Sequence, residues 1–145
     1  MKNIVTKELV CPHVYAKYGE RSIKFMRKEI LETIDVIRNQ IVCAPIVINN
    51  GKNCTQRGLR CNICELVANK TKAGKLYLTA HSFGAGLDFS SPKYTANQMR
   101  DMILKNQHLL PYKIRMESPI DAPTWVHIDV LCEPTQLDKV YIFRA

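Results

Sequence analysis

The sequence predicts an α+β fold in which helices pack on a largely antiparallel sheet. Apolar residues recur at helical spacing early in the chain, at Ile23, Met26, Ile30, Ile34, Ile37 and Ile41. Short alternating or β-branched runs dominate its last third, at 112–116, 124–131 and 140–143. Because helices precede strands instead of alternating with them, this order favours antiparallel pairing over a parallel sheet built from strand–helix–strand units.

The first half of the chain is expected to hold two helices with a strand between them. Residues 1–20 show no clear periodicity, and no element is assigned there. The apolar stripe of 22–41 predicts one long amphipathic helix. The β-branched run 44–48 predicts a strand, which the turn residues 49–51 close. A second helix is expected from residue 57 or 58 to Gly74, because four apolar residues fall on one face: Leu59, Ile63, Leu66 and Val67.

The second half is expected to hold the sheet and one further helix. Strands at 76–79 and 87–89 enter and leave a loop of small residues. Segment 96–107 carries Met99, Met102 and Ile103 at helical spacing, which predicts a third and shorter helix. The runs 112–116, 124–131 and 140–143 are expected to complete the sheet.

Length and composition indicate one soluble globular domain spanning 1–145. A chain of 145 residues, with 46% hydrophobic and 23% charged residues, can bury a sizeable core without disulfides. No apolar run approaches the roughly 20 residues that cross a bilayer, so membrane insertion is not expected. Met1–Glu8 lacks an apolar stretch, and no secretory signal is expected. The net charge of +8 suits an anionic partner, but the basic residues are scattered and predict no nucleic-acid groove.

Six cysteines lie at positions 11, 43, 54, 61, 64 and 132. Without a signal peptide, reduced thiols are expected in place of a disulfide framework. Cys61 and Cys64 alone have a metal-like spacing, and a structural zinc site would call for a second such pair. The predicted second helix also encloses both. Cys54 is a candidate third ligand, but a fourth must come from elsewhere, so packing in the core is the expected role.

Residues 79–89 read Thr-Ala-His-Ser-Phe-Gly-Ala-Gly-Leu-Asp-Phe and place an imidazole and a carboxylate on either side of a small-residue loop. His81 and Asp88 are too far apart for adjacent turns of one helix. Gly84 and Gly86 permit a tight reversal between them, because glycine adopts backbone angles that other residues avoid. The two side chains can therefore meet at one point.

A second histidine lies in an alternating run near the end of the chain. His127 and Asp129 project from the same face of the expected strand, and Trp125 shares that face. Val126, Ile128 and Val130 pack the opposite face into the core. The run by itself also fits a solvent-facing strand, or a buried histidine satisfied by its neighbouring aspartate. Two histidines and an aspartate are ligand types of catalytic zinc, whose fourth position is left to water.

Together, Thr-x-His-x-x-Gly-x-Gly-x-Asp-Phe at 79–89 and Trp-x-His-x-Asp at 125–129 resemble the zinc D-alanyl-D-alanine carboxypeptidase family. That family shares its fold with the hedgehog signalling domain and includes bacteriophage endolysins that cut cell-wall peptides. Gly86 stands where the family usually has alanine. The family's arginine near a helix start, with an asparagine five residues on, is matched by Arg57 and Asn62. The resemblance extends over about 45–131.

The resemblance implies roles for individual residues. His81, Asp88 and His127 would bind Zn²⁺, and a guanidinium would hold a substrate carboxylate in a bidentate pair. Arg57 is the family match for that guanidinium, and Arg60 competes with it.

The general base is less clearly marked. Relatives often place a carboxylate three residues before the second histidine, where this chain has Thr124. Asp129 is slightly favoured as the base, although it can instead orient a ligating histidine. Asp121 is a near-equal alternative, and Glu117 is more distant.

The function implied is a zinc metallopeptidase, a hydrolase of peptidoglycan stem peptides at a D-Ala-D-Ala terminus or an L-Ala-D-Glu type bond. Such a protein would stay cytoplasmic until released, or be associated with a virion. Two alternatives remain open: a non-catalytic zinc-binding interaction module of the same fold, and a basic nucleic-acid-binding protein using Cys54, Cys61 and Cys64. The sequence does not determine the bond, the delivery route or the oligomeric state.

Overall fold

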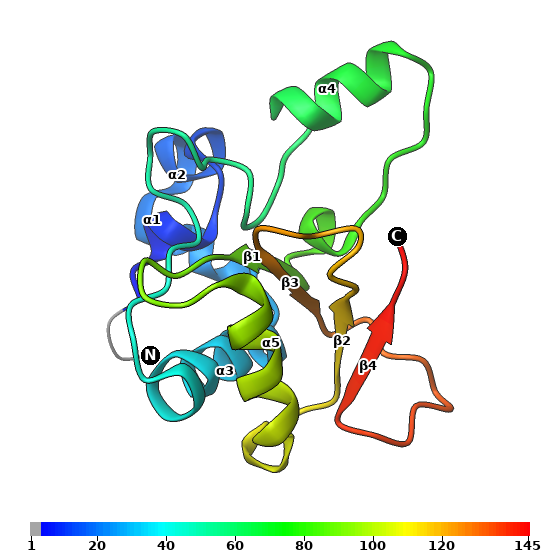
Figure 1. Cartoon of the computed structure of the whole chain (residues 1–145). Helices are drawn as coiled ribbons and strands as arrows, with labels where there is room; N and C mark the ends of the chain where they lie inside the picture. Colours follow the sequence, from blue (N-terminus) through cyan, green and yellow to red (C-terminus); the bar gives the residue numbers. More distant parts are fainter. Residues whose placement is uncertain (1–3) are drawn as a thin grey trace.

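The computed structural model describes residues 4–145 (Figure 1). Its helices are α1 (Thr6–Leu9), α2 (Pro12–Tyr18), α3 (Lys28–Val36), α4 (Glu65–Lys72) and α5 (Ala96–Lys105). Tighter or wider helical segments are η1 (Gly19–Phe25), η3 (Ala80–Phe83) and η4 (Gln107–Leu109), which are 3₁₀, and the π-helical η2 (Ile37–Val42). The strands are β1 (Gly86–Phe89), β2 (Ile114–Glu117), β3 (Val126–Asp129) and β4 (Val140–Phe143).

The four strands form one mixed sheet in the order β1-β3-β2-β4. The β1–β3 and β2–β3 pairs are antiparallel, whereas β2 and β4 are parallel. The α+β class is therefore confirmed, and the expected antiparallel sheet is wrong for β4. The segment between β3 and β4 crosses the start of β2, where the Gln136 side-chain amide donates to the carbonyls of Ile114 and Asp138. This crossing delivers β4 to the far side of β2, running in the same direction.

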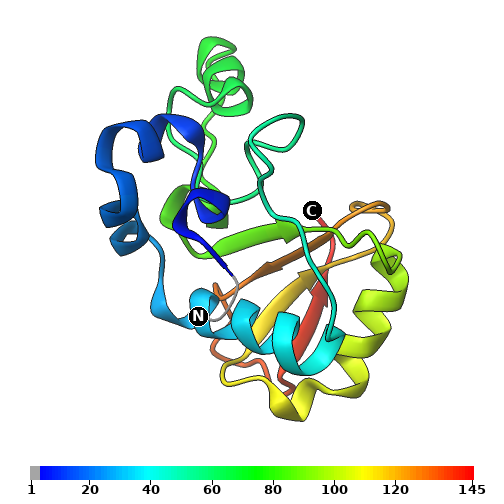
Figure 2. The same ribbon diagram turned by 90° about the vertical axis from the view of Figure 1, so that its left-hand side faces the viewer.

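Alternate residues of the strands separate the core from a polar face. The helices α3 and α5 and the segment η2 cover one face of the sheet (Figure 2). Six fully buried apolar side chains come from the strands: Leu87, Phe89, Ile114, Met116, Val126 and Ile128. Burial of each stabilises the fold by roughly 1.5–3 kcal/mol. The alternate positions of the same strands carry charged or imidazole side chains: Asp88, Arg115, Glu117, His127 and Asp129.

The single long helix expected at 22–41 is interrupted, so that prediction is wrong. A 3₁₀ segment ends at Phe25, the backbone is extended at Met26 and Arg27, and α3 begins at Lys28. The Arg27 N–H donates to the carbonyl of Gly84 at 2.9 Å. That contact with the loop around His81 competes with helix propagation. A tertiary hydrogen bond therefore interrupts the helix at Arg27, although the sequence keeps its helical periodicity. The buried stripe of Ile30, Ile34, Ile37 and Ile41 is present as expected.

Three other expectations are wrong. The run 44–48 makes a single bridge, between Val47 and Ser90, and is not a strand. Segment 76–79 is also not a strand, and its Leu76 is 88% exposed. The second helix begins at Glu65, so Cys61 and Cys64 precede it instead of lying inside it. In addition, α1, α2 and the start of η1 occupy part of the stretch 1–20, where no element was assigned.

The later elements agree with the sequence to within a few residues: β1, α5, β2, β3 and β4 lie where strands or a helix were expected.

Across the part of the chain that the structure describes, none of the helices has the length and apolar character needed to traverse a bilayer. The expectation about a secretory signal concerns Met1–Glu8, of which residues 1–3 lie outside the described residues.

Candidate metal centre

His81, Asp88 and His127 converge on one point from three elements, η3, β1 and β3. Antiparallel pairing places Asp88 directly opposite His127. His127 Nδ1 lies 2.7 Å from Asp88 Oδ1 and 3.2 Å from His81 Nε2, and His81 Nε2 lies 3.3 Å from Asp88 Oδ2. All three residues are buried. The convergence predicted from two distant sequence motifs is therefore present.

Two of these three separations are close to the distance between neighbouring ligand atoms of a zinc ion. Zinc binds histidine nitrogen and carboxylate oxygen at about 2.0–2.2 Å, so two ligand atoms of a tetrahedral site lie about 3.3 Å apart. The 3.2 Å between the two histidine nitrogens and the 3.3 Å from His81 Nε2 to Asp88 Oδ2 are close to that spacing, whereas the 2.7 Å from His127 Nδ1 to Asp88 Oδ1 is a hydrogen-bond distance. The donor set of two imidazoles and one carboxylate is that of zinc centres that keep an open position.

Each histidine is oriented through its other ring nitrogen. His81 Nδ1 donates to the carbonyl of Gly58 at 2.9 Å, which leaves Nε2 free to present its lone pair. His127 Nε2 lies 3.3 Å from Asp129 Oδ2, so this nitrogen donates and Nδ1 faces the centre. Histidine ligands of metals are commonly held in this way by a carbonyl or carboxylate.

Asp129 is itself fixed on both oxygens. Arg115 donates Nε to Oδ1 at 2.9 Å and Nη2 to Oδ2 at 3.0 Å, and the Leu131 N–H donates to Oδ1. Although burial alone would raise the pKa of Asp129, the hydrogen bonds from His127 and Arg115 hold it below its usual value. The charged form of Asp129 is therefore favoured, and its Oδ2 is placed to accept from His127 Nε2.

The centre is electrostatically arranged for a cation. Burial opposes charge on both Asp88 and His127, but hydrogen bonds outweigh it: those from His127 and His81 lower the pKa of Asp88, and those to Asp129 and Asp88 raise the pKa of His127 to about 9. His127 lies between two carboxylates, Asp88 and Asp129. Burial lowers the pKa of His81, which favours its neutral, lone-pair-bearing form.

Two glycines shape the loop that carries His81 to Asp88. Gly84 has φ +61°, and a Cβ there would lie 2.0 Å from the carbonyl oxygen of Phe25. Gly86 has no unusual φ, but a Cβ there would lie 2.7 Å from the Cβ of Ala80. The absence of a side chain at Gly86, where the family it resembles has alanine, therefore leaves room for the Ala80 methyl group.

The centre opens into a cavity of about 480 Å³. Arg60, Glu117, Trp125 and Phe143 are among its lining residues. Parallel pairing of β2 with β4 sets Phe143 beside Glu117, and its ring packs edge-on to His127 and beneath the Arg115 guanidinium. Phe143 was not singled out from the sequence, because its position depends on a parallel pairing that strand periodicity does not reveal.

The remaining predicted site residues are distributed around this cavity. Asp121 is outside its lining and pairs with Arg144 at 2.7 Å. Arg57 donates to Ser90 Oγ at 2.7 Å and lines an adjoining hollow of about 290 Å³, which shares Arg60, Asp88 and Trp125 with the main cavity. The role predicted for Arg57 stays a prediction. Trp125 is half-buried and forms part of the cavity wall.

Arg60 and Glu117, which the sequence offered only as the competitor of Arg57 and as a more distant candidate base, both line the cavity. Arg60 Nη2 lies 3.0 Å from Asp88 Oδ2, and its Nη1 donates to the Tyr77 hydroxyl at 3.1 Å. Burial raises the pKa of Glu117, as does the nearby negative charge of Asp88, although His127 counteracts this. The alternation of 112–116 contains the signal for Glu117: extended by one residue, it places Glu117 on the polar face with Arg115.

No protein-family model, curated protein or solved structure matches this chain.

Proposed function

We propose that this protein is a zinc-dependent peptidase that hydrolyses peptidoglycan stem peptides. The observation that carries the proposal is the convergence of His81, Asp88 and His127 beside a cavity of about 480 Å³. That volume lies within the range of small-ligand sites, which is about 300–1,000 Å³. His81 Nε2, an Asp88 oxygen and His127 Nδ1 would hold the ion. A zinc ion in such a site acts as a Lewis acid and acidifies water to a pKa of about 7.

Glu117 is the general base in this proposal. A base must reach the cavity and be free of a strong cationic partner. Asp129 fails the second condition because Arg115 and His127 occupy its oxygens, and Asp121 fails the first. Glu117 lines the cavity, and its raised pKa suits a group that takes a proton from water and returns it to the leaving amine. It would replace the carboxylate that Thr124 does not supply.

Arginine side chains would bind the acidic parts of the peptide. Arg60 lies at the metal centre and Arg57 in the adjoining hollow, so a substrate that spans both hollows meets two guanidinium groups. The net charge of +8 favours association with an anionic wall polymer. The chemistry proposed here is shared by a D-Ala-D-Ala terminus and an L-Ala-D-Glu type bond.

A non-catalytic module would lack a general base, and Thr124 stands where relatives often have that carboxylate. Glu117 in the cavity is a candidate replacement, which favours the peptidase. The nucleic-acid alternative required Cys54 beside Cys61 and Cys64. Instead, Cys54 lines the hollow of Arg57.

Purified peptidoglycan incubated with zinc-loaded protein tests the proposal, with fragments read by mass spectrometry. We expect cleavage within the stem peptide, abolished by a chelator and by Glu117→Gln. Intact wall material after incubation with protein of verified zinc content would refute catalysis. Fragments that are equally abundant with Glu117→Gln would refute the base.

A further inference from the structure

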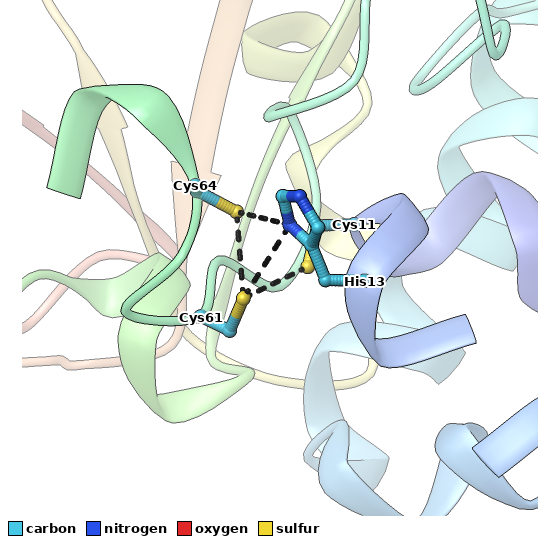
Figure 3. Close-up of side chains that lie close together, drawn as sticks. All are labelled: Cys11, His13, Cys61 and Cys64. Carbon is cyan, nitrogen blue, oxygen red and sulfur yellow. Dashed lines mark hydrogen bonds between the residues drawn. The ribbon is translucent and has the colours of Figure 1, made fainter. Parts of the chain in front are cut away.

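Three cysteines and one histidine form a second cluster, away from the cavity (Figure 3). Cys11 and His13 come from the start of α2, and Cys61 and Cys64 from the segment that leads into α4. Cys11 and Cys64 are buried, Cys61 is half-buried, and His13 closes the cluster from the solvent side. All six cysteines are free thiols.

The side-chain atoms have the spacing of four ligands around one zinc ion. Sγ–Sγ distances are 3.6 Å for Cys11–Cys61 and 3.9 Å for Cys61–Cys64. His13 Nδ1 lies 3.7 Å from Cys61 Sγ and 3.9 Å from Cys64 Sγ. With Zn–S of about 2.3 Å and Zn–N of about 2.0–2.1 Å, tetrahedral edges are about 3.8 Å between sulfurs and about 3.6 Å between sulfur and nitrogen. A disulfide would bring two sulfurs to about 2.05 Å.

The backbone around the cluster holds these ligands in place. The Cys11 N–H donates to the Leu59 carbonyl and the Leu59 N–H to the Leu9 carbonyl, both at 2.9 Å. This pairing fixes the two ligand-bearing segments side by side. It requires Gly58, where a Cβ would lie 2.1 Å from the Leu9 carbonyl oxygen.

The Cys-x-x-Cys segment forms a tight turn. The Cys64 N–H donates to the Cys61 carbonyl at 3.1 Å, and the backbone N–H groups of Ile63 and Cys64 approach the Cys61 sulfur. Backbone N–H groups that donate to a ligating sulfur stabilise its thiolate.

We propose that Cys11, His13, Cys61 and Cys64 bind one Zn²⁺ in a closed, four-ligand structural site. Three thiolates and an imidazole fill a tetrahedral shell and leave no position for substrate. The site is distinct from the centre of His81, Asp88 and His127, and it does not depend on the proposed peptidase function. It replaces the sequence expectation that these cysteines only pack in the core.

The site explains how α4 is attached to the molecule. Figure 1 shows α4 standing out from the remaining elements, connected by two long segments without regular structure. At its base lies a small apolar cluster of Cys11, Cys64 and Val67, separate from the main core. So small a cluster buries little apolar surface, and a zinc ion would provide the missing attachment.

The same attachment supports the wall of the other centre. Residues 57–61 lie between the two sites, with Cys61 in the cluster and Arg60 against Asp88. The Gly58 carbonyl accepts from His81, and the Arg60 N–H donates to the His81 carbonyl at 3.2 Å. Zinc at the cysteine site would therefore hold Gly58 and Arg60 in register with His81.

Metal analysis combined with cobalt substitution tests the site. We expect protein purified under reducing conditions to hold two zinc equivalents. His81→Ala/His127→Ala is expected to keep one of them, and Cys64→Ser to lose one. With Co²⁺ in place of zinc, His81→Ala/His127→Ala should still show thiolate-to-cobalt charge-transfer absorption. The other centre has no sulfur ligand and cannot produce that absorption, so failure of the peptidase proposal leaves this readout intact.

His13 provides a test that avoids misfolding, because the side chain is exposed and its replacement opens no cavity. His13→Ala should lower cobalt and zinc affinity at the thiolate site, and His13→Cys should restore it as a four-cysteine site. Cys54→Ser and Cys132→Ser are matched controls that should keep both equivalents. The proposal is overturned if His81→Ala/His127→Ala binds no zinc, if its cobalt form lacks thiolate absorption, or if the reduced protein contains a disulfide among these cysteines.

Discussion

Asp88 and His127 face each other across the β1–β3 pair, with Asp88 Oδ1 2.7 Å from His127 Nδ1. The register of the two strands brings together these residues, which are 39 positions apart in the sequence. On an antiparallel pair, opposite residues on one face bring their side chains within contact distance. A shift of one residue in the pairing would turn His127 to the core face and dismantle the centre.

Asp129 is predicted to act through His127 and not as the base. We expect Asp129→Asn to weaken zinc affinity at the His81–Asp88–His127 centre by about 10- to 100-fold, because the amide cannot act as a charged acceptor for both His127 and Arg115. Competition with a chelator of known affinity measures this. Asp121→Asn is the control and should leave the affinity unchanged, since Asp121 pairs with Arg144 outside the cavity. Unchanged affinity in Asp129→Asn would contradict the orienting role.

Glu117→Gln should separate metal binding from catalysis. The substitution keeps the shape of the side chain but removes the proton acceptor, so we expect hydrolysis to fall by about 10²- to 10⁴-fold with zinc content unchanged. In the wild type, activity should fall at acid pH with an apparent pKa above the usual value for glutamate, because burial raises the pKa of Glu117. That acid limb should be absent from the residual activity of Glu117→Gln, and its persistence there would assign it to another group.

Arg60 and Arg57 are predicted to differ in their effect on substrate binding. A hydrogen bond to a charged group contributes about 1.5–3 kcal/mol, so losing one costs roughly 10- to 150-fold in kcat/KM. Arg60→Lys should show this loss on short peptides, because the Arg60 guanidinium lies at Asp88. Arg57→Lys should show it only on peptides long enough to reach the adjoining hollow. The measurement compares each peptide with its amidated form, for which both losses should shrink. Equal losses on the amidated peptides would mean that neither arginine binds a carboxylate.

The elements from β1 onward could be predicted from the sequence because their signals are local. Alternation at 126–129 sets Val126 and Ile128 in the core and His127 at the centre, and the capping box of Thr95 and Gln98 begins α5. The parallel placement of β4 could not be predicted, because it depends on how the segment between β3 and β4 crosses β2. No local pattern encodes that crossing.

The two candidate metal-binding clusters differ in predictability for a related reason. His81 and Asp88 lie within one motif, so two of the three ligands are marked by spacing. The cysteine cluster draws on Cys11 and His13, about 50 residues before Cys61 and Cys64 and in a Cys-x-His pattern rather than a second Cys-x-x-Cys. Helical periodicity at 57–74 also suggested that Cys61 lies in a helix, whereas α4 begins only after Cys64.

Gly86 and Ala80 are predicted to be energetically coupled. In Gly86→Ala the new methyl group would lie 2.7 Å from the Cβ of Ala80, so Ala80 must move. Overpacking of this kind costs about 1–3 kcal/mol. Because Ala80 immediately precedes His81, the movement should also weaken metal binding. Thermal unfolding and chelator competition, measured on the same samples, report the two effects separately.

The double variant Ala80→Gly/Gly86→Ala supplies the test of the cause. Removing the Ala80 methyl group should restore most of the lost stability, apart from about 0.5–1 kcal/mol for the added flexibility of glycine. Gly84→Ala is the contrasting control. Its methyl group would meet the Phe25 carbonyl oxygen at 2.0 Å with φ at +61°, so neither Ala80→Gly nor any side-chain exchange should rescue it. If the Gly86→Ala and Ala80→Gly penalties simply add, the contact with Ala80 does not explain glycine at position 86.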